Sequence, residues 1–141
     1  ITDDFWDRRY RQIRDFERYL HENGTRVIKI FLNVSKEEQR ERLLDRINEP
    51  DKNWKFSSGD IHERTYWDEY MKAYEQMLEH TATEDAPWFV VPADNKWFAR
   101  YLVSEIVLNA LQQIDPQIPE LAESERAKLE ECRKLLEEDQ G

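Results

Sequence analysis

The segment VIKIFLNV, residues 27–34, constrains the fold of this chain more than any other stretch. It is almost wholly apolar, with one lysine, Lys29, and it shows no regular alternation with polar residues. Such a run predicts a β-strand that is covered on both faces, as in a parallel sheet. A second short, buried strand is predicted for WFVV, residues 88–91, between Pro87 and Pro92.

Helical patterns alternate with these strands. Apolar residues recur at helical spacing over residues 4–22, and Gly24 follows as a stop signal. Ser35, with Glu38 three residues later, is a capping-box signature that starts the next helix. Further helices are predicted over residues 60–80, 96–114 and 120–138. This alternation predicts an α/β layer fold, and because two strands make a poor sheet, we expect the other strands to lie before Ile1.

Charge and cysteine content limit the partners of the chain. Its 141 residues carry a net charge of −10, which argues against a general nucleic-acid binder or a protein of anionic membranes. The one cysteine, Cys132, cannot form an internal disulfide, so a reducing compartment such as the cytoplasm is expected. No apolar run approaches the roughly 20 residues that span a bilayer. Any anion site must therefore be a local basic cluster.

Basic residues do gather after the first strand. Arg42 and Arg46 are four positions apart on the predicted helix and share a face. Guanidinium groups bind phosphate oxygens in a bidentate manner, so this cluster is a candidate clamp for a polyanion such as a phosphate chain. The alternative is a solvated helix with ion pairs between its own charged residues. The cluster consists of Arg40, Arg42, Arg46, Lys52, Lys55 and Arg64.

The stretch PDKNWKFS lies between two predicted helices, and residues 50–60 show no helical stripe. Trp54 and Phe56 are interleaved with Lys52 and Lys55. A mobile lid needs apolar anchors for closure and cations that meet its ligand, and this composition supplies both. The alternative is an ordinary loop whose tryptophan fills the edge of a core.

A second candidate site follows the second strand, where Asp94, Lys96 and Arg100 occur. Ligands of open parallel sheets bind beyond the carboxyl ends of the strands. The alternative is that Asp94 or Asn95 simply caps the next helix. The three histidines show no metal-ligand spacing, and three glycines are too few for a glycine-rich phosphate loop.

Several stretches together resemble the second family of polyphosphate kinases, and more narrowly its polyphosphate:nucleotide phosphotransferase branch. They are SKEEQ…RLL, NWKFS, ERTYWDEYM.AYE, T.T..APW and VPADNKW, which occur in this order over about residues 5–119. The resemblance implies a P-loop kinase-like, three-layer parallel sheet, of which this chain supplies two strands, a lid and flanking helices. It also implies magnesium-dependent phosphoryl transfer between inorganic polyphosphate and nucleoside mono- or diphosphates, such as AMP and ADP.

The resemblance also implies roles for individual residues. Arg42, Arg46, Lys52, Lys55 and Arg64 become candidate contacts of the phosphate chain, whereas Asp94, Lys96 and Arg100 are candidates for the nucleotide side. The family's glycine-rich phosphate loop and the Asp-Arg motif after it are missing. We therefore expect the Mg²⁺ ligands to lie upstream, no catalytic residue within this chain, and no activity of this chain alone.

The implied organisation has two parts. Residues 1–115 would be the C-terminal part of the kinase-like domain, with the lid at 41–66, and residues 116–141 an acidic helical tail. The expected partners are polyphosphate, an adenine nucleotide and further copies of the same protein. Two other functions stay open: a nucleoside or nucleoside monophosphate kinase of the same fold, and a non-catalytic helical module that binds a partner.

Overall fold

A computed structural model describes residues 4–139 and contains the predicted parallel strand pair. Strand β1 (Lys29–Asn33) runs parallel to β2 (Trp88–Pro92), with Lys29 opposite Trp88 and Asn33 opposite Pro92. β1 is shorter than the predicted strand over residues 27–34, because only five of its residues have partners on β2.

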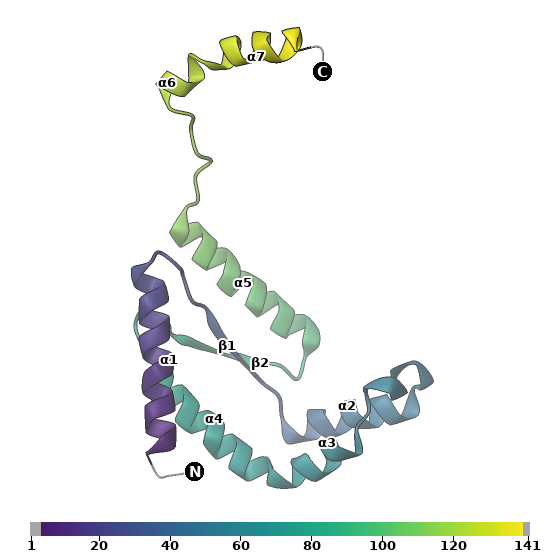
Figure 1. Cartoon of the computed structure of the whole chain (residues 1–141). Coiled ribbons are helices and arrows are strands. Elements are labelled where there is room, and N and C mark those ends of the chain that lie inside the picture. Colours follow the sequence, from purple (N-terminus) through teal and green to yellow (C-terminus); the bar gives the residue numbers. More distant parts are fainter. Residues whose placement is uncertain (1–3, 140–141) are drawn as a thin grey trace. The chain divides into compact units, whose positions relative to one another are not determined.

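Helices precede, separate and follow these strands along the chain, as the alternation in the sequence predicts (Figure 1). The elements before β2 are α1 (Phe5–Glu22), α2 (Lys36–Asn48), the 3₁₀ helix η1 (Pro50–Lys55), α3 (Ser58–Glu63), the 3₁₀ helix η2 (Arg64–Tyr66) and α4 (Trp67–Thr81). After β2 come α5 (Lys96–Ile114), α6 (Glu123–Arg126) and α7 (Leu129–Glu138). The predicted helices over residues 4–22 and 96–114 are confirmed within one residue.

Opposite faces of the strand pair carry different helices. The core cluster of Val91, Ala93 and Ala99 joins β2 to α5, and Ile30 of β1 packs against it. On the other face, the ring of Phe31 lies 5.0 Å from that of Tyr74 on α4. Successive side chains of a strand point to opposite faces, so Ile30 and Phe31 each meet a different helical layer. This explains why the strand is apolar on both sides.

The lysine within this apolar strand has a buried partner. Lys29 Nζ lies 2.8 Å from Glu17 Oε2 of α1, and these side chains are only 8% and 10% exposed. Lys29 also donates to the carbonyl oxygen of Thr81 (2.5 Å), and Trp88 Nε1 donates to Thr81 Oγ1 (2.9 Å). Lys29 therefore connects β1 to α1 and to the end of α4, and the polar groups buried there satisfy one another.

The region predicted to be a loop, residues 50–60, is instead helical: η1 is followed by α3. Asn53 Nδ2 donates to the carbonyl oxygens of Arg46 (2.8 Å) and Ile47 (2.9 Å). These acceptors are in the last turn of α2, where carbonyl groups lack helical partners. The short 3₁₀ turn is thus fastened to the end of α2 by one side chain, a contact that apolar periodicity does not reveal.

The predicted helix over residues 60–80 is not continuous, because η2 separates α3 from α4. Thr65 Oγ1 donates to the carbonyl oxygen of His62 at 2.7 Å, and side-chain bonds of this kind compete with regular helical bonding. The predicted helix over 120–138 is also broken, into α6 and α7. The apolar side chains of α7 stay exposed, and helices this short gain little stability without packing.

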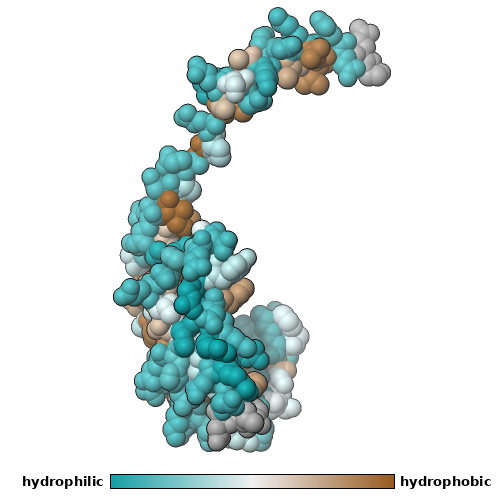
Figure 2. All heavy atoms as spheres, turned by 60° about the vertical axis from the view of Figure 1, so that its left-hand side comes forward, coloured by the Kyte–Doolittle hydropathy of each residue, from teal (hydrophilic) through white to brown (hydrophobic). Residues whose placement is uncertain are grey.

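The chain forms two compact units, one up to Ala110 and one from Leu111 onward. Figure 2 shows a face of the molecule on which hydrophilic side chains predominate and apolar ones form separate patches. Within residues 4–139, no helix is both long and apolar enough to cross a membrane.

We predict that Lys29→Met destabilises the fold by about 3 kcal/mol, because it leaves the carboxylate of Glu17 buried without its partner. The double variant Glu17→Leu/Lys29→Met removes both charges and should regain more than half of that loss. Urea unfolding followed by circular dichroism measures both values. A single variant as stable as the parent chain would show that the ion pair contributes nothing.

Candidate functional site

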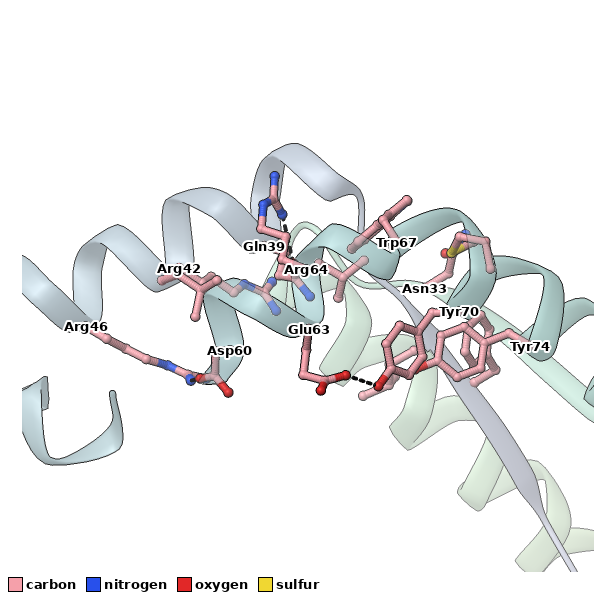
Figure 3. Close-up of a pocket in the computed structure, with 15 residues that line it drawn as sticks. Asn33, Gln39, Arg42, Arg46, Asp60, Glu63, Arg64, Trp67, Tyr70 and Tyr74 are labelled. Carbon is pink, nitrogen blue, oxygen red and sulfur yellow. Dashed lines mark hydrogen bonds and ion pairs between the residues drawn. The ribbon is translucent and has the colours of Figure 1, made fainter. Parts of the chain in front are cut away.

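A cleft of about 580 Å³ opens beyond the carboxyl end of β1, between α2 and the α3–α4 segment. Its polar lining comes from Asn33, Gln39, Arg42, Arg46, Asp60, Glu63 and Arg64. Phe31, Trp67, Tyr70, Met71 and Tyr74 supply most of its apolar and aromatic lining. Figure 3 shows Arg46 facing Asp60 at one end of the view and Tyr70 beside Tyr74 at the other.

The start of α2 is held by two side chains. Ser35 Oγ accepts from the backbone N–H of Glu38 (3.1 Å), which confirms half of the predicted capping box. The other half is replaced: the N–H of Ser35 donates to Asp94 Oδ1 (2.7 Å), and the carboxylate of Glu38 instead pairs with Arg42 Nε (2.7 Å). The hydrogen bond from Ser35 to Asp94 connects the start of α2 to the loop after β2.

Three of the predicted arginines line the cleft, and each has a protein partner. Arg46 Nη1 lies 3.3 Å from Asp60 Oδ2, and both side chains are well exposed to solvent. Arg64 Nη1 donates to the carbonyl oxygen of Lys36 (2.7 Å) and to Gln39 Oε1 (2.8 Å). The structure therefore brings Arg46 and Arg64, from segments that are separate in the sequence, to the same cleft.

Arg42 is the most firmly held of the three. Besides its ion pair with Glu38, its Nη2 donates to the carbonyl oxygens of Ala93 (2.6 Å) and Asp94 (3.2 Å). These bonds join α2 to the end of β2, so Arg42 positions the wall of the cleft. Arg40, in contrast, lies outside the cleft lining and pairs with Glu37 (2.7 Å) and Glu41 (2.5 Å). For Arg40 the structure therefore agrees with the alternative of a solvated, ion-paired helix.

The lysines of η1 do not line this cleft. Lys52 Nζ lies 2.6 Å from Glu49 Oε2, and the hydrogen bond with that carboxylate raises the pKa of Lys52 above its ordinary value. Lys55 Nζ lies 5.0 Å from the centroid of the Trp54 ring, a cation–π contact. Trp54 is 78% exposed, so the alternative in which it fills the edge of a core is wrong.

Asp94 acts as a cap, although not for the helix that follows it. The hydrogen bond from the backbone of Ser35 lowers the pKa of Asp94 below its ordinary value. Asn95 caps α5 instead, because its Oδ1 accepts from the N–H of Phe98 (3.2 Å). Lys96 and Arg100 are exposed on α5 and are not among the residues that line the cleft.

Sequence reasoning missed the aromatic wall and the two acidic residues of the cleft. The sequence predicted a helix over residues 60–80 but no site role for Trp67, Tyr70 and Tyr74, which line the cleft from α4. Tyr70 Oη lies 2.5 Å from Glu63 Oε2, and this hydrogen bond raises the pKa of Tyr70. Apolar periodicity predicts which side of α4 is apolar. It does not predict the break at η2, which orients α4 so that this side lines the cleft.

A resident metal does not fit the part of the chain that the structure describes. Residues 4–139 contain no group of three or more histidine, cysteine, aspartate or glutamate side chains that could hold a metal ion. Asp60 and Glu63 face the cleft, but Asp60 is engaged by Arg46 and Glu63 by Tyr70.

Comparison with known proteins identifies the family. The family model described as "Polyphosphate kinase 2 (PPK2)" matches residues 1–119. The chain belongs to the polyphosphate kinase 2 family. The resemblance found in its motifs is thereby confirmed, and the matched region includes every residue of the cleft.

Similar proteins and structures support this membership of the polyphosphate kinase 2 family. An ADP-polyphosphate phosphotransferase of Rhodopseudomonas palustris is 50% identical over 132 residues, which are 94% of this chain and 46% of that protein. An AMP/ADP-polyphosphate phosphotransferase of Meiothermus ruber is 45% identical, over 85% of this chain and 45% of that protein. The crystal structure of polyphosphate kinase 2 from Arthrobacter aurescens TC1 matches with a TM-score of 0.81 and 46% identity, over 93% of this chain and 47% of that one.

The chain thus spans about half the length of these named relatives. An uncharacterized protein in the chlN 3′ region of Leptolyngbya boryana is 51% identical over 135 residues, 96% of this chain and 99% of that protein.

We predict that Asp94→Ala lowers the stability of the chain at pH 7, because the N–H of Ser35 loses its acceptor. The pKa of Asp94 is lowered in the folded state, so its carboxylate stabilises the fold at pH values above its unfolded pKa of about 4. This stabilisation is lost as the pH falls through the folded-state pKa. The melting temperatures of parent and variant should therefore differ most at neutral pH and converge on acidification. Asp94→Asn, which keeps an acceptor without the titrating charge, is the matched control. A constant difference between pH 7 and pH 2 would contradict the assignment.

Proposed function

We propose that the whole protein transfers phosphoryl groups between inorganic polyphosphate and nucleoside mono- or diphosphates, interconverting AMP, ADP and ATP. The observation that carries the proposal is the convergence of Arg42, Arg46 and Arg64 on one cleft, in a chain whose named relatives are polyphosphate phosphotransferases. Phosphoryl transfer depends on positioning and on neutralising charge that is spread over phosphate oxygens, and arginines from two segments suit both tasks.

The residues of this chain would divide the work. Arg46 and Arg64 would bind phosphate oxygens in the cleft, and Arg42 would hold the wall on which they act. Lys52 and Lys55, at residues 50–55 of the proposed lid over 41–66, would meet the polyphosphate chain. Lys96 and Arg100 are proposed to face the nucleotide side, with Asp94 holding the loop before them in place.

The wider architecture is proposed on the same basis. The three-layer arrangement would be that of a P-loop kinase-like sheet, with residues 1–115 in the kinase-like domain and 116–141 as a helical tail. Family membership implies a divalent metal, which we propose is Mg²⁺, and its ligands would have to come from outside residues 4–139. We also propose a homo-oligomer in the cytoplasm, the compartment that the single cysteine favours.

We predict that the 141-residue chain forms no ATP from ADP and polyphosphate, whereas the whole protein does. The chain has only three glycines and lacks a glycine-rich loop whose N–H groups could hold phosphates. A luciferase assay of both proteins measures the difference. Turnover by the 141-residue chain above a buffer blank would contradict this division, and absence of turnover by the whole protein with every nucleotide would overturn the proposed function.

We predict that Lys55→Ala in the whole protein raises the KM for polyphosphate roughly tenfold to a hundredfold at low salt, because a charge-assisted contact is lost. The effect should shrink as salt screens the exposed charge. Trp54→Ala should instead lower kcat through poorer lid closure, with a weaker dependence on salt. Steady-state kinetics at two ionic strengths separate the two variants, with Arg40→Ala as a basic-residue control outside the cleft. Unchanged polyphosphate kinetics of Lys55→Ala at low salt would show that η1 is an ordinary surface turn.

A further inference from the structure

The arginines of the basic cluster differ in the charge of their partners. Those that form ion pairs with carboxylates are Arg40, Arg42 and Arg46. Arg64 instead donates to two neutral acceptors, the carbonyl oxygen of Lys36 (2.7 Å) and Oε1 of Gln39 (2.8 Å). A further contact of Arg64 is also neutral, because its Cζ lies 5.9 Å from the centroid of the Trp67 ring. Within residues 4–139, Arg64 is thus held in place without an ion pair.

The bond between Gln39 and Arg64 joins two elements of the cleft (Figure 3). Gln39 lies on α2, and Arg64 begins η2, 25 positions later in the sequence. Both side chains are half-buried. An arginine side chain only donates hydrogen bonds, so the amide oxygen of Gln39 must face it. Both protein hydrogen bonds of Arg64 use Nη1, which leaves the N–H groups of its Nε and Nη2 for phosphate oxygens.

A neutral side chain at position 39 is not the choice that stability alone would favour. A glutamate has the same length as Gln39, also accepts from arginine and forms the stronger, charge-assisted bond. Glutamates occupy the neighbouring positions of α2: Glu37, Glu38 and Glu41. Glu37 attracts Arg64 at longer range, but its hydrogen bonds are with Arg40. Gln39 therefore holds Arg64 without compensating its charge at close range.

We propose that Gln39 is a positioning residue for phosphate binding, which orients the guanidinium group of Arg64 and keeps its positive charge available to phosphate oxygens. The inference rests on the proposed function and adds to it a residue that carries no charge of its own. A carboxylate in the same place would compete with phosphate for Arg64, as Asp60 does for Arg46. Phosphoryl transfer depends on neutralising the charge of phosphate oxygens, so an arginine without an ion pair is suited to that task.

The test introduces Gln39→Glu into the whole protein and measures the binding of ADP and of tripolyphosphate by isothermal titration calorimetry. The new carboxylate still accepts from Arg64, so the melting temperature should stay the same or rise. Affinity for at least one probe should fall about fivefold or more, because the charge of Arg64 is now compensated. That affinity should also depend less on salt concentration, a change that a purely structural role would not produce. The probe that is weakened shows whether Arg64 meets the nucleotide phosphates or the polyphosphate chain.

Two further variants complete the test. Gln12→Glu is the matched control, because Gln12 Oε1 accepts from Arg9 Nη1 (3.3 Å) on α1, outside the cleft lining. It should bind both probes within about twofold of the parent protein. Gln39→Met removes the acceptor without adding charge, and it covers the case in which Gln39→Glu fails to fold. It should also weaken a probe, and unchanged affinity would show that Arg64 needs no acceptor and would overturn the inference.

The remaining outcomes separate this inference from the proposed function. Normal binding of both probes by Gln39→Glu would overturn the inference, as would an equal loss in Gln12→Glu. A loss of affinity together with a lower melting temperature of Gln39→Glu would indicate a structural role and would overturn it as well. If the parent protein turns over ADP and polyphosphate in any of these cases, only the role of Gln39 falls. If no nucleotide and polyphosphate pair supports turnover, the proposed function itself falls.

Discussion

The parallel pairing of β1 with β2 is the constraint on which the cleft depends. Parallel strands end at the same edge, and here Asn33 lies opposite Pro92. The two chain segments then leave side by side, so that the N–H of Ala93 donates to the carbonyl oxygen of Asn33 (2.8 Å) and the N–H of Ser35 donates to Asp94. The position of α2 relative to β2 follows from these bonds. Without the pairing, the arginines of α2 would have no fixed relation to the rest of the fold.

Two polar junctions then hold the layers around that pair. Beneath the sheet, Lys29 connects β1 to Glu17 of α1 and to the end of α4. At the carboxyl edge, Arg42 connects α2 to the carbonyl groups of Ala93 and Asp94. The first junction fixes the helical layer that carries the aromatic wall, and the second fixes the helix that carries Arg46. The two walls of the cleft are therefore positioned by different contacts.

The sequence predicted the elements that depend on local signals and missed those that depend on distant partners. Apolar periodicity located α1 and α5, and the apolar run identified β1 as a strand. Its predicted covering on both faces is incomplete, because Leu32 is 53% exposed. The predicted burial of residues 88–91 is wrong for Phe89 and Val90, which are 37% and 53% exposed. The helical form of residues 50–55 could not be predicted from apolar periodicity, because Asn53 holds this turn by reaching back to the end of α2. Likewise, the separation in sequence between Ser35 and Asp94 hides the bond that replaces half of the capping box.

The sequence predicted only the part of the candidate site that depends on local spacing. The spacing of Arg42 and Arg46 on one helical face is a local property, and both do line the cleft. That Arg42 serves the scaffold depends on the distant carbonyl groups of Ala93 and Asp94. That Tyr70 and Tyr74 line the same cleft depends on the break at η2, which sets the direction of α4.

A crystal structure of the whole protein with ADP bound tests the central claim most directly. The account predicts phosphate oxygens at hydrogen-bond distance, about 2.7–3.2 Å, from the guanidinium groups of Arg46 and Arg64. It also predicts that Asp60 is displaced from Arg46. Phosphates bound away from these arginines, with the Arg46–Asp60 pair intact, would contradict it.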